Sequence, residues 1–190
     1  MPIVEESHAF WPYGQLSKIE LLSLRSFIVN GYDVNLWTYG EIHNAPSGVR
    51  VRNAREVLPE SEVFLATNDR SYAQFSDVFR YALLMKYGGL YFDADVVALK
   101  PSKEFPRMPF LVQERNDDNV DQITNNLMYD PKPYHGSLIH MAFLLAKLYP
   151  KEHIRWCEIG PDLLGMLVKF HPSHGFCIMP TAFAEPFRSR

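Results

Sequence analysis

The amino-acid sequence predicts an α/β fold, in which helices pack on a sheet. Segments with the two-residue alternation of a half-buried strand are interleaved with segments that repeat every three to four residues. The 190 residues contain no internal repeat, low-complexity tract or long linker, and 47% of them are hydrophobic and 22% charged. This composition is typical of a globular protein with a sizeable core. We therefore expect residues 1–190 to form a single domain.

The first predicted helix covers Ser17 to Asn30. Ser17 is a good N-cap and Glu20 stands three residues later, so their side chains can form a capping box. Gly31 provides the stop. After it, alternating residues predict a strand over residues 34–39, a short strand over residues 49–51 and a short helix over residues 54–58.

The central predicted helix covers Ser76 to Tyr87 and ends at Gly88-Gly89. Its apolar residues recur at the spacing of one helical face; they are Phe75, Val78, Phe79, Ala82 and Leu83. A short apolar strand, Leu90 to Phe92, leads directly into Asp93. The remaining predictions are an extended run over residues 96–99, a strand over residues 110–113, helices over residues 137–148 and 161–170, and an extended segment over residues 178–180.

Charge and cysteine content exclude several function classes. The formal net charge is -3 and no run of lysine or arginine occurs, so a nucleic-acid-binding surface is not expected. Cys157 and Cys177 do not form a CxxC pair, which argues against structural zinc; they are expected to be reduced thiols, with one disulfide as the alternative. The sequence also lacks the HExxH, GxSxG and P-loop motifs.

The location of the protein is predicted from what the sequence lacks. The N-terminal residues have neither the basic region nor the apolar stretch of a secretory signal, and the most apolar run, residues 137–149, is too short to cross a bilayer. We therefore expect a cytoplasmic protein. Peripheral contact with the inner face of a membrane through an exposed helix face stays open.

Asp93 and Asp95 carry the strongest chemical signal. Two carboxylates separated by one residue at the end of a buried apolar strand are costly unless a cation neutralises them. Oxygen ligands suit Mn²⁺ and Mg²⁺, and a site with so few carboxylates implies that substrate phosphates complete it. The pair therefore predicts a divalent metal ion that stabilises the charge on a leaving diphosphate.

Asp77 and Arg80 stand three residues apart on the central helix and so project from one face. Asp77 could accept hydrogen bonds from sugar or ribose hydroxyls, and Arg80 could bind a phosphate, a carboxylate or a sugar oxygen. Each feature alone has an ordinary interpretation. The acidic pair could lie in a surface loop, Asp77 and Arg80 could form a surface ion pair worth roughly 0.2–0.5 kcal/mol, and the two glycines could simply end a helix.

The whole arrangement over residues 76–101 is more specific than its parts. The segment reads SDVFRY, then YGGLYFDADVV and finally KP, and it resembles the sugar-binding region containing DXD motif of family 32-type glycosyltransferases. That group includes bacterial polysaccharide-assembly transferases, yeast Golgi mannosyltransferases and, more distantly, glucosylating toxin domains. Weaker similarity covers Phe10-Trp11, residues 16–39, the run Asn125-Asn126-Leu127-Met128 and Gly160-Pro161.

The resemblance implies a GT-A fold, with a Rossmann-like mixed sheet flanked by helices. It also implies a nucleotide-sugar donor, more often linked to UDP than to GDP, that binds with Mn²⁺ or Mg²⁺. The acceptor would be a saccharide or a lipid-linked hydroxyl, as in surface polysaccharide assembly. By position, Asp77 and Arg80 would contact the donor's sugar and ribose.

The remaining roles also follow from the resemblance. Asp93 would touch ribose, sugar and metal, Asp95 would bind the metal directly, and Ala94 lies between them in the donor site; Asp93, Asp95 and Arg80 are the expected catalytic residues. Phe10 and Trp11 would hold the base at the end of the first strand. Asn126 and Asp162 fall where contacts with the donor sugar or the acceptor are expected.

The family transfers sugar with retention of configuration, by a same-face attack that the departing phosphate assists, and this agrees with the lack of an evident general base. A third metal ligand is expected late in the chain. His174 is one candidate; water, or a C-terminal segment beyond Arg190, are the alternatives.

Two rival functions remain at this stage. A HAD-type phosphatase also places a nucleophilic aspartate in a strand-end DxD, although the residues before Asp93 do not suit it. The chain could also be a non-catalytic module that binds nucleotide-sugars.

Overall fold

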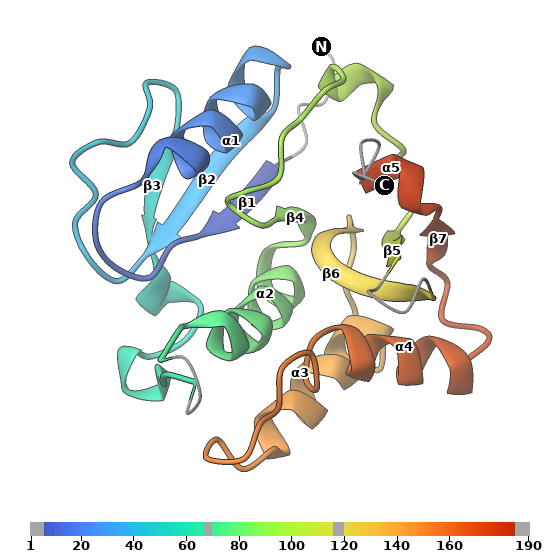
Figure 1. The fold of residues 1–190 in the computed structure, drawn as a ribbon. Coiled ribbons are helices and arrows are strands. Elements are labelled where there is room, and N and C mark those ends of the chain that lie inside the picture. The colour runs from blue at the N-terminus through green and yellow to red at the C-terminus, as the bar shows by residue number, and fades with distance from the viewer. Residues whose placement is uncertain (1–5, 67–69, 116–119, 185–190) are drawn as a thin grey trace.

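The computed structural model describes residues 6–66, 70–115 and 120–184. At its centre lies a mixed sheet of seven strands in the spatial order β3-β2-β1-β4-β6-β5-β7 (Figure 1). The strands are β1 (Glu6–Phe10), β2 (Asp33–Thr38), β3 (Arg50–Asn53), β4 (Gly89–Phe92), β5 (Phe110–Arg115), β6 (Asp121–Asp130) and β7 (Cys177–Met179). The predicted α/β class with a mixed sheet is confirmed.

The direction of the strands changes across the sheet. Strands β3, β2, β1 and β4 are parallel, whereas β6 runs antiparallel to both β4 and β5, and β7 is parallel to β5. The chain proceeds outward from β1 to β2 and β3 and then returns to place β4 on the other side of β1. The carboxyl ends of β1 and β4 therefore form a topological switch point, where sheets of this kind bind ligands.

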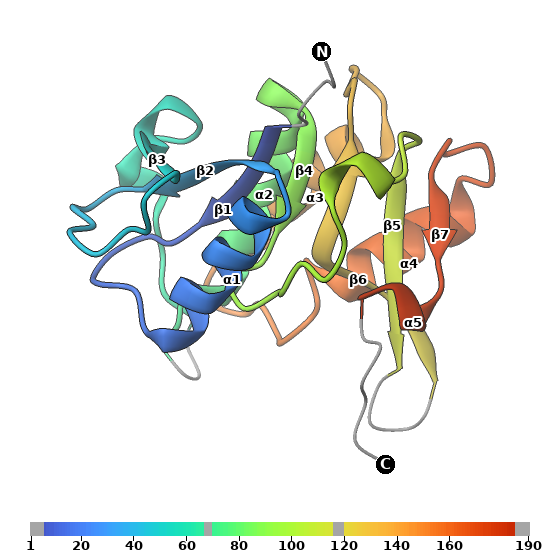
Figure 2. The same cartoon turned by 90° about the horizontal axis from the view of Figure 1, so that it is seen from above.

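Helices cover both faces of the sheet. Figure 1 shows α1 (Lys18–Val29) on one side and α2 (Ala73–Tyr87), α3 (Leu138–Leu148) and α4 (Pro161–Phe170) on the other. The view from above in Figure 2 places the short α5 (Thr181–Ala184) beside β5 and β7. Three 3₁₀ turns complete the described elements: η1 (Ala54–Glu56), η2 (Glu60–Glu62) and η3 (Ser102–Glu104).

Two apolar cores result, one on each face of the sheet. Alternate residues of β4 serve both, because Leu90 and Phe92 pack toward α1 whereas Tyr91 packs toward α2. The Phe92 ring stacks on Phe27 of α1 with centroids 3.7 Å apart. Strand β4 is thus held from both sides, and so is the start of the loop that carries Asp93.

The predicted capping box of α1 is present: the Ser17 side chain accepts from the backbone N–H of the first turn, and Glu20 accepts from the Ser17 N–H at 2.5 Å. Helix α2 begins three residues before the predicted Ser76. Its N-cap, Tyr72, has no side-chain capping bond, so the sequence carries no start signal there. It ends at Gly88 as predicted. A side chain at Gly89 would stand 2.5 Å from the Glu6 carbonyl oxygen, and φ is +88° there, so glycine is required.

Strand β6 was not predicted as a strand.

No helix among the described residues is long and apolar enough to cross a membrane. Both cysteines are free thiols, so the disulfide alternative is wrong.

Candidate functional site

A cleft of 680 Å³ opens at the switch point. Its walls come from the end of β1, the first half of α2, the loop after β4, strands β5 and β6, and the loop that precedes α4. Of the predicted site residues, all but Asp162 line this cleft. The position of each decides what it could do chemically.

Arg80 is the centre of a buried polar network, and the residue is only 3% exposed. The Nη1 atom donates to the Asn125 carbonyl at 2.6 Å and to Asp93 Oδ2 at 3.3 Å. The Nη2 and Nε atoms donate to the Ser76 hydroxyl and carbonyl at 2.8 and 3.1 Å. The Nη2 atom also lies 3.1 Å from Asp93 Oδ1 and 3.3 Å from Asp77 Oδ1. The alternative of a surface ion pair is therefore wrong.

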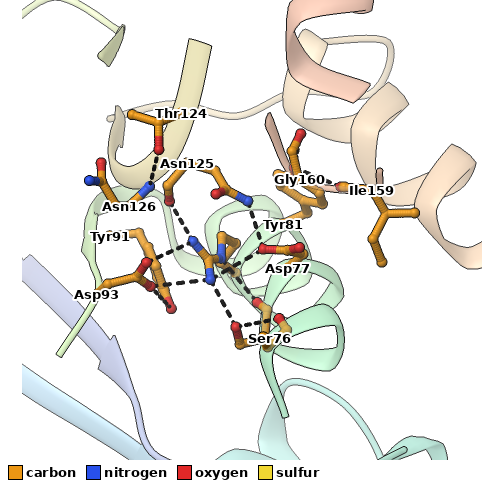
Figure 3. Close-up of polar contacts among 12 residues, drawn as sticks. Ser76, Asp77, Tyr81, Tyr91, Asp93, Thr124, Asn125, Asn126, Ile159 and Gly160 are labelled. Carbon is orange, nitrogen blue, oxygen red and sulfur yellow. Dashed lines mark hydrogen bonds and ion pairs between the residues drawn. The ribbon is translucent and has the colours of Figure 1, made fainter. Parts of the chain in front are cut away.

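Asp77 is held on its other side by strand β6 (Figure 3). The Asn125 side-chain amide donates to Asp77 Oδ1 at 2.7 Å. Burial raises the pKa of Asp77 above its usual value, and the Arg80 charge and the Asn125 hydrogen bond oppose that rise. The carboxylate is thus fixed at one wall of the cleft.

Asp93 follows β4 directly, and its backbone N–H donates to the Asn126 carbonyl at 2.7 Å. The Tyr91 hydroxyl donates to Asp93 Oδ1 at 3.1 Å (Figure 3). Burial raises the pKa of Asp93 to about 6; Arg80 lowers it, whereas the nearby Asp95 charge raises it further. Since its side chain is still 31% exposed, it can reach a ligand.

Asp95 differs from the other carboxylates of the cleft. It is exposed and lines the cleft, and no side chain or backbone group among the described residues hydrogen-bonds or ion-pairs with it. Two carboxylates within one loop, one partly and one fully open to the cleft, fit a divalent cation whose other ligands come from a phosphate-bearing substrate. The donor set therefore agrees with the expected Mn²⁺ or Mg²⁺.

A third protein ligand is not found in the described part of the chain, where no group of three or more His, Cys, Asp or Glu side chains could hold a metal. His171 and His174 follow the far end of α4, and ten helical residues place that end ~15 Å from Pro161. Neither histidine lines the cleft.

The end of β1 supplies two aromatic residues. The Phe10 ring is 5% exposed and stacks on Phe79 of α2 with centroids 3.9 Å apart, so most of it belongs to the core. The Trp11 ring is only half-buried, and its indole N–H is enclosed without a hydrogen-bond partner among the described residues. Trp11 is thus the better placed of the two to contact a base.

Strand β6 brings two adjacent asparagines to the cleft. Its pairing with β5 shifts from Met128 to Thr124 between consecutive β5 residues, so the residues between them bulge. Asn125 holds Asp77 and Arg80, whereas the Asn126 side-chain oxygen is buried without a partner among the described residues and lines the cleft. Asn125, which was not predicted as a site residue, fixes the network.

Ala94 and Asp162 complete the predicted set. Ala94 is buried between the two aspartates and lines the cleft. Asp162 is exposed in the first turn of α4 and is not a cleft residue, although its neighbour Pro161 is. Contact of Asp162 with donor or acceptor stays a prediction.

The cleft residues that were not singled out from the sequence include Gln74, Glu114 and Trp156. Gln74 lies one helical turn before Asp77, a spacing that could have indicated it. Glu114 and Trp156 lie outside any motif, and only the folded chain brings them to the cleft.

Solved structures share this arrangement of a mixed sheet flanked by helices. "PaToxG Glycosyltransferase" matches with a TM-score of 0.61 at 16% identity, over 87% of this chain and 68% of that chain. A double cysteine-to-serine mutant of a transferase matches with a TM-score of 0.53 at 12% identity, over 89% and 85%. At these identities the similarity establishes the fold.

The chain belongs to the family described as glycosyltransferase sugar-binding region containing DXD motif, which matches residues 23–127. The protein is therefore a glycosyltransferase, and the phosphatase alternative is wrong. A comparison with curated proteins returned no match.

Proposed function

We propose that the protein transfers a hexose from a UDP-linked donor to a hydroxyl group, with Asp93 and Asp95 holding Mn²⁺ or Mg²⁺. The observation that carries this proposal is the free Asp95 carboxylate beside the network of Arg80, Asp77 and Asp93. A carboxylate without a partner among the described residues, next to carboxylates that pair with Arg80, fits a site that a cationic ligand completes.

The metal ion, when bound, would neutralise the charge that develops on the leaving diphosphate. The protein residues supply position. Arg80 orients Asp93 through two of its nitrogens, and the Tyr91 hydroxyl donates to the same carboxylate. Because two side chains fix this carboxylate, little reorganisation is needed when the donor binds.

The donor sugar is proposed to lie against Asp77, and the base near Trp11. Asp77 keeps an oxygen for sugar hydroxyls, since its contacts with Asn125 and Arg80 both involve Oδ1. The enclosed indole N–H of Trp11 would gain a partner from an acceptor on the base or ribose.

Retention of configuration is proposed because every carboxylate that lines the described cleft has either a protein donor or an assigned ligand. Among the described residues that line it, Glu20, Asp77, Asp93 and Glu114 already accept hydrogen bonds from protein donors. Asp95 has none, but it is assigned to the metal. A same-face attack, in which the departing phosphate takes the acceptor's proton, needs no general base from the protein.

The acceptor is proposed to be a saccharide or a lipid-linked hydroxyl, which agrees with polysaccharide assembly at the cytoplasmic face of a membrane. Exposed apolar residues on α1, namely Ile19, Leu22 and Val29, would supply peripheral contact with that membrane. We also propose that residues 1–190 form one domain, because β1 and β7, near the two ends of the described chain, belong to one sheet.

A thermal-shift screen of nucleotide-sugars with and without Mn²⁺ tests the metal and the donor together, because a ligand that binds the native state raises the melting temperature. Asp95→Asn should remove the Mn²⁺-dependent part of that shift. Its melting temperature without ligand should stay the same, since Asp95 is exposed and unpaired in the described structure.

Asp33→Asn is the matched control. Asp33 starts β2, at the amino ends of the parallel strands and therefore opposite the cleft, and it forms an ion pair with Arg50 at 2.7 Å. This variant should keep the full shift. If Asp95→Asn also keeps it, the metal assignment fails. Mass spectrometry detects hydrolysis of the donor and transfer of its sugar. Mn²⁺-dependent binding of the donor with neither reaction would instead identify a non-catalytic module.

A further inference from the structure

Trp156 is an exposed aromatic residue at the rim of the cleft. It is 65% exposed, yet it lines the same cavity as Asp77 and Asp95. Large aromatic side chains are costly to leave in water, so one that stays open beside an active site is a candidate for ligand contact.

The loop that carries Trp156 is firmly anchored at both ends. Ile154 and Ile159 are buried in the core, and the Tyr81 hydroxyl of α2 donates to the Ile159 carbonyl at 3.1 Å. Between them, Cys157 adopts a positive φ of 68°, a conformation that costs energy in a residue other than glycine. The Cys157 carbonyl accepts from the N–H groups of both Gly160 and Asp162. Trp156 is therefore held at the rim of the cleft by an ordered loop.

Gln74 provides a polar group in the same cleft. It is 4% exposed, and its Oε1 atom is buried without a hydrogen-bond partner among the described residues. A buried oxygen without a hydrogen-bond partner is costly, because it has lost its contact with water. Because Gln74 lines the cleft, a ligand bound beside its side chain could donate the missing hydrogen bond.

Trp156 lies on the side of the cleft away from the proposed position of the base. Trp11 belongs to the end of β1, whereas the loop of Trp156 leads into α4, which packs on β6. Strand β4, with Asp93 after it, lies between β1 and β6. A donor that spans Trp11, the two aspartates and Asp77 leaves the side of Trp156 for the second substrate.

We propose that Trp156 and Gln74 bind the acceptor, and that the acceptor presents a pyranose ring there. This inference rests on the proposed function. The negative face of an indole attracts the positively polarised C–H bonds of a sugar ring, and the Gln74 oxygen accepts from a ring hydroxyl. An extended peptide would instead need a row of apolar pockets or a free strand edge.

The test compares variants in transfer and in donor hydrolysis, with the UDP-sugar selected by the thermal-shift screen and Mn²⁺. The acceptor probes are methyl and 4-nitrophenyl glycosides of common hexoses, together with serine- and tyrosine-containing peptides. Trp156→Ala should raise the KM for the glycoside roughly tenfold. Trp156→Phe should restore most of the affinity, and Gln74→Leu should also weaken the acceptor. Donor KM and donor hydrolysis should stay within about twofold of the wild type, since neither side chain is assigned to the donor.

Three results would overturn the acceptor assignment while leaving the proposed function intact. They are transfer to peptides but to no glycoside, an unchanged glycoside KM in both Trp156→Ala and Gln74→Leu, and a loss of donor binding in Trp156→Ala equal to the loss of acceptor binding. Failure of the wild type to bind or hydrolyse any UDP-sugar would contradict the proposed function itself, and the acceptor site with it.

Discussion

At the scale of single residues, Arg80 determines how the site is built. One guanidinium contacts Ser76, Asp77, Asp93 and the carbonyl of Asn125, and it lies over the Tyr91 ring with its central carbon 4.8 Å from the centroid. A planar group with five donors can serve so many partners at fixed angles, whereas the ammonium of lysine cannot. Arg80 thus joins α2, β4 and β6.

Arg80→Ala is expected to lower the free energy of unfolding by about 3–5 kcal/mol, because it leaves the carboxylates of Asp77 and Asp93 enclosed without their cation. Urea denaturation measures this change. Arg155→Ala is the control: Arg155 is 79% exposed and its pair with Glu158 should contribute less than about 1 kcal/mol. Equal denaturation midpoints for the two variants would show that Arg80 does not balance the buried charges.

Sequence reasoning identified Asp77, Arg80, Asp93 and Asp95 together but could not establish that the first two are buried. Helical spacing places Asp77 and Arg80 on one face and says nothing of what covers that face. The cover comes from Asn125 on β6, a residue 48 positions away from Asp77. Gln74 and Trp156 were not predicted for the same reason, since the burial of Gln74 and the exposure of Trp156 arise only when the chain folds.

At the scale of elements, the close approach of α4 to α2 shapes the wall of the cleft. The N-cap of α4 is Gly160, and a methyl group there would stand 2.8 Å from Asp77 Oδ2 and 2.9 Å from the Asn125 side-chain nitrogen. The Tyr81 hydroxyl holds the same turn through the carbonyl of Ile159. Any side chain at residue 160 must therefore displace Asp77, Asn125 or the helix.

Gly160→Ala should lower both stability and donor binding, because the methyl group would disrupt the hydrogen bond between the Asn125 amide and the Asp77 carboxylate. Gly165→Ala, inside the same helix with nothing within 4 Å of the added carbon, should raise stability by about 0.5–1 kcal/mol. Thermal unfolding and donor titration of the two variants make the comparison. Similar effects from both substitutions would contradict the close packing of α4 on Asp77.

The elements were predictable to different degrees. The helices α1, α3 and α4 carry caps or an N-terminal proline and were predicted close to their observed bounds. Strand β6 was missed because its centre is Asn125-Asn126, and asparagine is depleted in strands. The bulge at these residues also removes the regular alternation that would have indicated a strand. The same bulge that obscures the strand pattern in the sequence brings both asparagines to the cleft.

At the scale of the whole molecule, a buried histidine links stability to pH. His8 of β1 is 1% exposed, and its Nδ1 accepts from the Trp37 indole N–H at 3.2 Å. Burial, assisted by Arg50 and Arg52, lowers the pKa of His8 from 6.5 to about 4, whereas Asp33 and the Gly88 backbone oppose the shift. Glu6 lies 4.0 Å from the imidazole and would also favour the charged form.

A folded-state pKa below the unfolded value means that the unfolded chain binds more protons between about pH 6.5 and 4. Stability should therefore fall as the pH decreases through this window, by about 2 kcal/mol between pH 7.5 and pH 5 from His8 alone. Asp77, Asp93 and Asp130 act in the opposite sense, because their pKa values are raised in the folded state.

Urea denaturation at the two pH values, for the wild type and for His8→Gln, isolates the histidine. Glutamine keeps an acceptor for Trp37 and does not titrate, so the variant should lose about 2 kcal/mol less than the wild type on acidification. An identical loss in both proteins would show that His8 is not kept neutral by the fold.

The loop of the two aspartates is fastened by helix α1 and by strand β6. The Ser23 hydroxyl of α1 donates to the Val96 carbonyl at 2.5 Å, and the Asn126 carbonyl accepts from the Asp93 N–H. The family match covers residues 23–127 and so includes both residues that hold this loop in place. The loop of Trp156 and the start of α4 lie beyond it. A substitution in the loop of Trp156 would therefore change the proposed acceptor site from outside the stretch that fastens Asp93 and Asp95.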